Sequence, residues 1–557
     1  MIQILDNLVG VIAGYAGLPS DPLKIIVCLV LSYPLAAVLK RLPDSQPQVK
    51  NIYVISVGLF FLVGIFNLWS GIRTIFISCA GTWLLSKYMQ GPLMPWINFV
   101  FIMGHMSINQ IYRQRFGNDD VVDITGSQMV LVMKLTAFAW NVHDGRAARR
   151  AQGGMGSLAP FQQESAITEL PDLLSYIAWA MFFPSMLIGP AFEFAQYKKW
   201  LDCSLYDVQV QQNTKAAKKM ANGRKIPRSG TAASKRAAEG IFWLVCYALL
   251  SPKFTVNYVL SDKFTAHSLL YRLWYVVPLA FTHRSKYYGI WKLSEGACVL
   301  AGFGFNGVKN GAIDWTSIEN ISPYEFETAQ NTKALLEAWN KNTNKWLKNY
   351  VYLRVTPKGK KPGFRSTMAT FATSAIWHGF YPGYYFAFAT GALAQTMGKY
   401  YRRNFRPFFV TPVQPSAKGD SRATVKQSAS FSHKLGYDIV SWIVTQYTWA
   451  YIVQPFVVLT LMGSLRFWSR YYFIVHIGMF ITFAFFNSGA SVPLKRSLKQ
   501  RIAQTEAITE KESKTAEQIT MIPQPSEEME REVADMKARA MDHIDAKYRD
   551  LKSRTKQ

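Results

Sequence analysis

Long apolar runs separated by short polar segments dominate the chain. Runs close to the ~20 mostly apolar residues that span a bilayer recur about eleven times. They cover residues 22–39, 52–69, 72–88, 92–112, 124–142, 174–190, 238–260, 269–282, 383–399, 437–463 and 470–489. A soluble domain rarely needs so many uncharged runs of this length. The pattern predicts an all-α, polytopic transmembrane protein of about eleven spans, with additional re-entrant and amphipathic helices around a central chamber.

Composition and charge placement support a membrane protein over a nucleic-acid-binding protein. The 557 residues are 50% hydrophobic and only 17% charged, yet the net charge is +27. The basic residues cluster in short loops beside apolar runs, for example at 146–150 and at Arg402-Arg403. This placement keeps loops in the cytosol next to anionic lipid. A nucleic-acid surface would interleave aromatics with the charges, and the basic stretch 208–237 contains none.

Cysteine spacing and the first residues of the chain argue against a zinc site, a disulfide framework and a signal peptide. Five cysteines are scattered singly, without a CxxC pair. Neither a zinc site nor a disulfide framework is therefore expected, and no metal or cofactor is predicted. The first ~20 residues lack a basic region and include Asp6, so a cleaved signal peptide is not expected.

The composition changes near residue 494. We expect residues 1–493 to form the membrane-embedded domain and residues 494–557 to form a charged, helical cytosolic tail. Apolar residues recur in the tail at steps of three or four, which predicts one apolar stripe on a helix. The stripe consists of Met529, Val533, Met536, Ala540, Ile544, Tyr548 and Leu551. A helix that docks on the body fits this pattern, as does a homo-oligomer formed through the tail or the membrane helices.

Three polar residues interrupt the early apolar runs. His105 and Asn109 are four positions apart and therefore share one helix face. We expect a polar seam against a neighbouring helix, with a substrate-lining face as the alternative. Lys134 lies in the middle of a run. An intramembrane charge is by default a functional hypothesis, and pairing with a carboxylate is an equal alternative.

The glycines of Gly302-x-Gly304-x-x-Gly307 have the spacing of a dinucleotide-binding fingerprint. That fingerprint requires a preceding strand and a βαβ unit, and the sequence predicts neither. We therefore reject a nucleotide site. Glycines in membrane helices usually allow two helices to approach closely, and we expect that role here.

Residues 339–385 contain the strongest candidate chemistry. An amphipathic stretch, WNKNTNKWLKNYVYLRV, leads into the basic turn TPKGKKPGF and then into an apolar run with His378 near its middle. A histidine at this depth is costly to charge. It should stay neutral and be able to accept a proton from a hydroxyl. By contrast, His476 has no polar neighbour in sequence and is expected to be a packed, hydrogen-bonded histidine.

Two motifs in this segment carry a family resemblance. Trp339-Asn340-x-x-Thr343-Asn344-x-Trp346-Leu347 is followed by Trp377-His378-Gly379-x-x-Pro382-Gly383-Tyr384. Together they resemble the paired signature of the membrane-bound O-acyltransferase family, within its branch of fungal lysophospholipid acyltransferases. Further matching segments lie at 94–105, 123–135, 140–146, 189–194 and 295–307. The resemblance covers roughly residues 15–490.

The resemblance implies transfer of a fatty acyl group from acyl-CoA to the free hydroxyl of a lysophospholipid at the endoplasmic reticulum membrane. It implies acyl-CoA as co-substrate, His378 as general base and Asn340 as its partner. Direct transfer requires no nucleophilic Ser or Cys. The candidate substrate-binding residues are Glu295, Trp339, Thr343, Asn344, Trp346, Tyr350, Arg354, Lys358, Lys360, Lys361, Trp377 and Tyr384.

Several alternatives remain open at this point. The basic residues among these candidates could contact CoA phosphates, or they could face lipid head groups. Another acceptor, such as a sterol, diacylglycerol or a protein, is compatible with the family. A lipid transporter or scramblase with polar residues along its path is the alternative from a different class.

Overall fold

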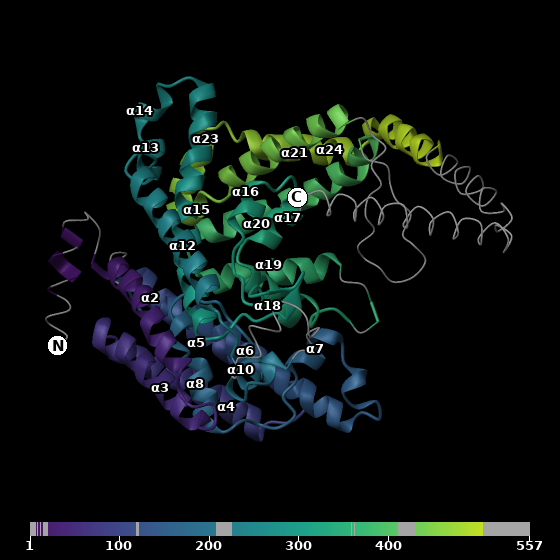
Figure 1. Ribbon diagram of the computed structural model, residues 1–557. Helices are drawn as coiled ribbons and strands as arrows, with labels where there is room; N and C mark the ends of the chain where they lie inside the picture. Colours follow the sequence, from purple (N-terminus) through teal and green to yellow (C-terminus); the bar gives the residue numbers. More distant parts are fainter. Residues whose placement is uncertain are drawn as a thin grey trace, which may run out of the picture. The chain divides into compact units, whose positions relative to one another are not determined.

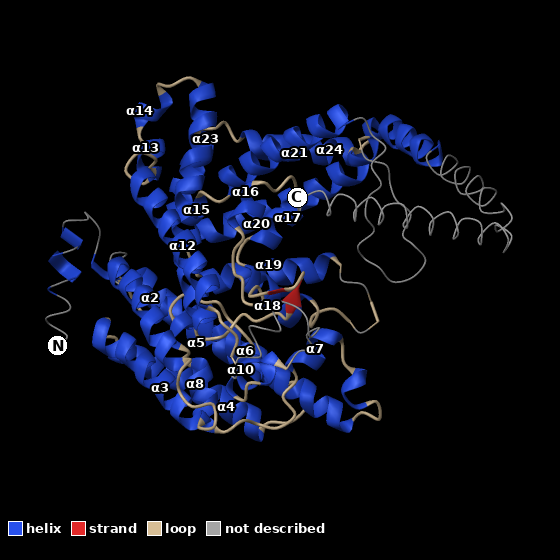
Figure 2. Ribbon diagram, in the orientation of Figure 1, coloured by secondary structure: helices blue, strands red, loops and turns tan. Residues whose placement is uncertain are grey.

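The protein is almost entirely helical in its computed structural model (Figures 1 and 2). The structure describes residues 7, 9–11, 13–14, 20–117, 122–207, 226–357, 359–360, 363–409 and 431–504. The only strands in these residues are β1 (Val308–Lys309) and β2 (Ala312–Ile313), which pair antiparallel. The all-α fold class is therefore confirmed.

Most of the longer helices overlap a predicted apolar run, but the helix that begins at Leu269 continues 18 residues beyond the run 269–282, and the helix 364–378 corresponds to none of the runs. The longer helices are α2 (Ser20–Leu39), α3 (Pro47–Leu59), α4 (Trp69–Tyr88), α5 (Met94–Phe116), α6 (Thr125–Arg150), α12 (Gly230–Leu250), α15 (Leu269–Leu300), α19 (Phe364–His378), α20 (Pro382–Asn404), α21 (Phe431–Ile452) and α24 (Ile474–Asn487). A π-helical turn, η1 (Phe60–Ile65), extends α3. These helices are as long as the average helix of a globular protein or longer, which agrees with the predicted membrane segments.

Shorter helices fill the connections. They are α7 (Pro160–Ser165), α8 (Leu173–Ala180), α9 (Phe183–Met186), α10 (Phe194–Leu201), α13 (Val256–Leu260), α14 (Asp262–Thr265), α16 (Pro323–Glu327), α17 (Thr332–Ala338), α18 (Lys341–Leu347), α22 (Pro455–Val458) and α23 (Leu461–Ser469). The run 174–190 is thus broken into α8 and α9. Pro184 near the start of α9 cannot continue the preceding helix but suits a first helical turn.

Fewer of the described helices are long and apolar enough to cross a membrane than the sequence pattern predicted. Two segments, Ser20–Leu39 and Pro47–Ile65, are by themselves long and apolar enough to cross a bilayer. The pair Leu461–Ser469 and Ile474–Asn487, bent by 79°, counts as a third if it acts as one span. The number of about eleven spans is not confirmed by this test and stays a prediction.

Glycines bring α12 and α15 into backbone contact. A Cβ built on Gly289 would lie 3.0 Å from the carbonyl oxygen of Gly240, and the reverse distance is also 3.0 Å. Small residues at such crossings let helices pack without a hydrophobic driving force from water. Helices α12 and α15 pack along each other (Figure 1), and Arg236 on α12 donates to the carbonyl of Trp315 in the loop after α15 at 2.8 Å.

The glycines of the 302–307 motif have a different role from the one expected. Helix α15 ends at Leu300, and Gly302, Gly304 and Gly307 follow it with φ angles of +104°, +92° and +78°. Glycine takes this left-handed backbone at no steric cost. The expectation of close helix contact is wrong, because these residues form a turn that leads into β1. The strand follows the motif instead of preceding it, which agrees with the rejection of a nucleotide fingerprint.

The chain divides into two compact units. One consists of residues 1–400 and 435–486, and the other of residues 401–434 and 487–557. All the candidate site residues belong to the first unit. The predicted tail, including its apolar stripe, lies outside the described residues from position 505 onward, and the domain boundary at residue 493 remains a prediction.

Candidate active site

Asn340 has an unusual backbone. Its φ and ψ angles are +43° and +55°, a left-handed conformation that Asn adopts more readily than most residues. The residue immediately precedes α18, and its carbonyl accepts from the amide of Asn344 at 3.0 Å. Its side-chain oxygen accepts a hydrogen bond from the Thr343 hydroxyl at 2.8 Å. Among the described residues its Nδ2 has no partner, so this amine can donate to a ligand.

Asn344 and Trp339 fix the entry to α18. The Asn344 amine donates to the carbonyls of Leu336 and Trp339, at 2.5 and 2.7 Å. The Trp339 ring packs against Trp291 with 5.1 Å between ring centroids and against Phe326 at 5.3 Å. These contacts hold the chain between α17 and α18, and therefore hold Asn340 in its left-handed conformation.

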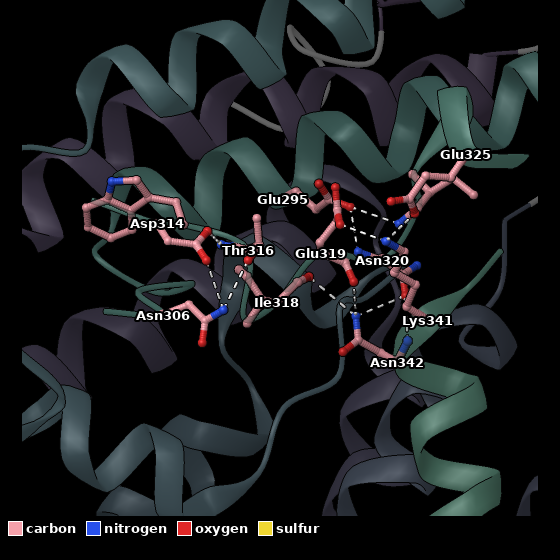
Figure 3. Close-up of polar contacts among 12 residues, drawn as sticks. Glu295, Asn306, Asp314, Thr316, Ile318, Glu319, Asn320, Glu325, Lys341 and Asn342 are labelled. Carbon is pink, nitrogen blue, oxygen red and sulfur yellow. Dashed lines mark hydrogen bonds and ion pairs between the residues drawn. The ribbon is translucent and has the colours of Figure 1, made fainter. Parts of the chain in front are cut away.

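The loop before α16 holds the residues that follow Asn340 in the chain (Figure 3). The carbonyl of Asn320 accepts from the Lys341 amide at 2.7 Å, and its side-chain oxygen accepts from the Asn342 amine at 3.0 Å. The carboxylate of Glu295 in turn accepts from the amides of Asn320 and Ile321, at 2.6 and 3.2 Å. Glu295 is fully buried. It is therefore connected through Asn320 to the backbone amide of Lys341, the residue after Asn340.

Cations surround the Glu295 carboxylate and offset its burial. Lys292 lies 3.3 Å and Arg236 3.5 Å from Oε2. Lys292 also faces Glu319 at 3.5 Å, which pairs with Lys341 at 2.8 Å. A buried carboxylate is tolerated only when paired and hydrogen-bonded, and this network satisfies both conditions.

His378 is the last residue of α19. Its half-buried imidazole lies among four aromatic rings, with centroid distances of 4.7 Å to Trp377, 5.7 Å to Tyr384, 5.3 Å to Phe388 and 5.1 Å to Phe456. These aromatic surroundings disfavour the charged form of the imidazole. The C-terminal end of a helix favours a cation by only ~0.3–1 kcal/mol, less than the effect of burial. No residue within the described ranges hydrogen-bonds to its ring nitrogens.

One face of α6 carries both signature segments. The Thr343 hydroxyl lies 3.3 Å from the sulfur of Met133, and the Trp346 indole donates to the Thr136 hydroxyl at 2.9 Å. The Trp377 indole donates to the carbonyl of Met129 at 3.0 Å. Positions 129, 133 and 136 share one side of a helix.

The two segments also meet each other. The ring centroids of Trp346 on α18 and Trp377 on α19 are 6.2 Å apart, within the range of aromatic contact. Residues that are more than 30 positions apart are thereby brought to one place, which the sequence alone did not establish.

Tyr350 belongs to a buried network behind α18. Its hydroxyl donates to the side-chain oxygen of Asn141 at 2.9 Å, and the Asn141 amine donates to Glu193 at 2.8 Å. Tyr350 lies in η4 (Lys348–Tyr352), a π-helical turn of a kind frequent at functional sites. The hydroxyl holds this turn on α6.

Arg354 has an acidic partner that the sequence analysis missed. Its two terminal nitrogens donate to the carboxylate of Asp144, at 2.8 and 2.5 Å, and its Nε donates to the carbonyl of Asn349 at 3.3 Å. The guanidinium also lies 4.2 Å from the centroid of the Trp140 ring. All three nitrogens are engaged inside the protein, so Arg354 joins α6 to the end of η4.

The lysines of the basic turn are the remaining candidates for binding an anion. Lys360 is exposed to solvent, whereas Lys358 and Lys361 lie outside the described residues. Any contribution of this turn to phosphate binding is a proposal.

The polar residues of the early helices form contacts between helices. The Nδ1 atom of His105 lies 3.0 Å from the Ser78 hydroxyl, and the Asn109 amine donates to Gln128 at 2.8 Å. These contacts agree with the expected polar seam. Lys134 donates to the carbonyl of Trp179 near the end of α8, so its partner is a helix terminus and not the carboxylate that was considered.

His476 behaves as a packed histidine. Its Nδ1 atom lies 3.0 Å from the Tyr451 hydroxyl, and its Nε2 atom lies 3.4 Å from the Thr390 hydroxyl. It therefore has hydrogen-bond partners of the kind that the sequence analysis expected.

Sequence reasoning missed Asn320, Asn342 and Asp144 as parts of the site. The only available signals were the polar composition around Asn320 and the acidic residue in WNVHDGR. Neither indicates a partner, because Asp144 and Arg354 are 210 positions apart.

Comparisons with known proteins agree with this architecture. Residues 114–417 match the model of MBOAT, the membrane-bound O-acyltransferase family. The chain is 44% identical over 488 residues to a lysophospholipid acyltransferase of Saccharomyces cerevisiae, covering 86% of this chain and 75% of that protein.

Two further relatives extend the comparison. A lysophospholipid acyltransferase of Schizosaccharomyces pombe is 37% identical over 503 residues, or 90% of this chain and 93% of that protein. Membrane-bound glycerophospholipid O-acyltransferase 2 of Gallus gallus is 30% identical over 505 residues, or 86% and 87%. The chain therefore belongs to the membrane-bound O-acyltransferase family.

Proposed function

We propose that this protein transfers a fatty acyl group from acyl-CoA to the free hydroxyl of a lysophospholipid, with His378 as general base and Asn340 as its partner. One observation carries the proposal. The His378 imidazole lies among aromatic rings beside Trp377, which is bonded to α6, and Asn340 is bonded to Thr343, which also contacts α6. Within the described ranges, neither the imidazole nor the Asn340 amine has a hydrogen-bond partner. The two fungal relatives are lysophospholipid acyltransferases, which supports a lysophospholipid as the acceptor.

The chemistry follows from these two groups. The lipid hydroxyl attacks the thioester carbonyl while a ring nitrogen of His378 takes its proton. The amine of Asn340 donates to the oxygen that gains negative charge. Collapse of this intermediate breaks the C–S bond, and the CoA sulfur leaves with the proton from the imidazolium. The products are a diacyl phospholipid and free CoA thiol.

Acyl-CoA also carries phosphates, which need cations. The turn between η4 and α19 contributes Lys358, Lys360 and Lys361, and we propose that it contacts the CoA phosphates. Changing these lysines to Glu should raise the KM for acyl-CoA more than the KM for lysophospholipid. Equal changes in both would refute a CoA-specific role.

The membrane setting completes the proposal. We infer about eleven passes around a central chamber, within a domain of residues 1–493, and a cytosolic tail of residues 494–557. Basic loops support cytosolic placement of the tail. We place the enzyme in the endoplasmic reticulum membrane and allow for a homo-oligomer. Protease digestion of sealed microsomes tests the orientation, since a cytosolic tail must be cleaved without detergent.

An acceptor panel tests the reaction. Purified enzyme receives labelled oleoyl-CoA with lysophospholipids of several head groups, a sterol or diacylglycerol, and products are identified by mass spectrometry. Diacyl phospholipid with stoichiometric CoA thiol is expected. Acylation of the sterol or diacylglycerol alone would replace the acceptor. Movement of lysophospholipid across vesicles without release of thiol would indicate a transporter.

His378→Ala tests the base. It should lower kcat by at least the ~10²–10⁴-fold typical of a lost general base, with insertion into the membrane unchanged. The matched control is His476→Ala, which removes another half-buried histidine held by Tyr451. Near-normal turnover in His378→Ala would end the assignment.

A further inference from the structure

Gln110 on α5 makes a hydrogen bond to the backbone of the histidine motif. Its Nε2 donates to the carbonyl of Trp377 at 2.8 Å, across 267 positions of sequence. That carbonyl lies in the last turn of α19, where carbonyls have no partner within the helix. The side chain is only 7% exposed. Gln110 thus completes the helix end from which His378 projects.

The orientation of the Gln110 carboxamide is fixed by chemistry. A backbone carbonyl can only accept, so the amine must face Trp377 and the oxygen must point elsewhere. The amide carbon lies 3.8 Å from the position of a Cβ built on Gly379, the residue after His378. Oε1 is buried and has no partner among the described residues. An unpaired buried acceptor lowers the stability of the fold. A residue present only for stability would avoid this cost.

The second contact of this motif comes from α6. The Trp377 indole donates to the carbonyl of Met129, so Trp377 is held by its side chain on α6 and by its backbone on α5. Rotation of the α19 terminus about the indole anchor would redirect the His378 ring. The hydrogen bond from Gln110 opposes that rotation, together with the packing of Trp377 on Trp346 and the aromatic rings around His378.

We propose that Gln110 is a positioning residue of the acyl-transfer site, because its amine fixes the α19 terminus and with it the direction of the His378 imidazole. The inference rests on the proposed role of His378. A misplacement of ~1 Å in a reacting group can cost ~100-fold in rate. Loss of this single bond should therefore lower kcat by about 10- to 100-fold and leave the KM for acyl-CoA unchanged.

The test is Gln110→Met, which preserves side-chain length and removes both the donor and the orphaned oxygen. The substitution removes one unpaired acceptor, Oε1 of Gln110, and leaves another at the Trp377 carbonyl, so the melting temperature of the purified protein should change little while kcat falls. Gln110→Glu keeps the shape and the acceptor but places an oxygen against the Trp377 carbonyl. It should also lower kcat.

Asn98→Leu is the matched control. Asn98 lies on the same helix, is fully buried, donates to the carbonyl of Leu135 at 3.2 Å and has an orphaned oxygen as well. It does not touch the histidine motif, so its kcat should stay within threefold of wild type. A kcat for Gln110→Met within threefold of wild type, or a loss matched by Asn98→Leu, would overturn the proposal.

The two levels of inference fail in different ways. An inactive His378→Ala together with an active Gln110→Met would refute the positioning role and leave the general base in place. An active His378→Ala would refute the base itself. A kcat loss in Gln110→Met that is fully explained by a lower fraction of folded protein would make Gln110 structural and also refute the positioning role.

Discussion

Asn340 combines two requirements in one residue. Its backbone is left-handed, which glycine tolerates and alanine does not. Its amine is the proposed donor to the oxyanion. An amide side chain that tolerates φ > 0 meets both needs, which gives a physical reason for asparagine at this position.

Two variants separate these requirements. Asn340→Gly should keep the melting temperature close to that of wild type and lower kcat by about 100- to 1,000-fold, the cost of one oxyanion donor. Asn340→Ala should lose similar activity and also about 1–2 kcal/mol of stability, because its Cβ opposes the left-handed backbone. Thermal unfolding and steady-state kinetics in detergent measure both. A loss of activity below tenfold in the glycine variant would make Asn340 a structural residue.

The pH profile tests the state of His378. Since its aromatic surroundings disfavour the charged form, the imidazole should already be neutral, the form that acts as a base, at pH 6. We expect kcat to stay flat as the pH falls from about 7.5 to 6. A histidine with the ordinary pKa of ~6.5 would instead lose activity over that interval. Such a loss, absent from the stability profile, would contradict the buried neutral state.

At the scale of elements, the contact between α12 and α15 is the most demanding. Gly240 and Gly289 leave no room for side chains, and a Cβ on Gly289 would lie 2.6 Å from Leu244. Elsewhere in the same unit, Gly478 on α24 has open space at its Cβ position. The same substitution should therefore have opposite effects at the two sites.

We expect Gly289→Ala to lower stability by about 1–3 kcal/mol through overpacking. Gly478→Ala should be neutral or stabilising by up to ~1 kcal/mol, because alanine is the better helix former. Melting temperatures of the two purified variants provide the measurement. Equal shifts would mean that the two helices can separate to accommodate the methyl group.

The sequence predicted helices well and their partners poorly. Apolar runs located α2, α4 and α5 to within a few residues, because such runs and helix-stop signals are local, whereas α15 continues to Leu300, well beyond the predicted run 269–282. The site is different. Arg354 looked like a phosphate ligand from its basic surroundings, and its partner Asp144 lies on another helix. Lys134 was predicted to have either a functional role or a carboxylate partner. Its hydrogen-bond acceptor is a backbone carbonyl, which no sequence pattern indicates.

For the whole molecule, the site lies within one compact unit. The residues from Glu295 to Tyr384 belong to the unit of residues 1–400 and 435–486. His378 and Asn340 were identified through motif resemblance, which is independent of packing. The docking of the neighbouring residues Trp377 and Thr343 on α6 was not predictable, since tertiary contact between residues far apart in sequence leaves no periodic signal.

Truncation after Gln504 tests the independence of the site. If residues 1–504 contain the whole acyl-transfer machinery, the shortened protein should retain kcat and both KM values within about twofold, which is ~0.4 kcal/mol or less in transition-state terms. The control is the full-length protein purified in the same detergent. A selective rise in the KM for acyl-CoA would instead assign the tail a role in binding.

The docking of both motifs on α6 has a consequence for variation among relatives. Trp377, Thr343 and Trp346 are each bonded to α6, at Met129, Met133 and Thr136. The spacing between the proposed base and the amide is therefore set by this helix and not by the intervening turn. The turn can then gain or lose residues, or exchange its lysines, while the reacting groups keep their separation. Relatives could therefore differ in their specificity for the acyl donor while the positions of the catalytic groups stay the same.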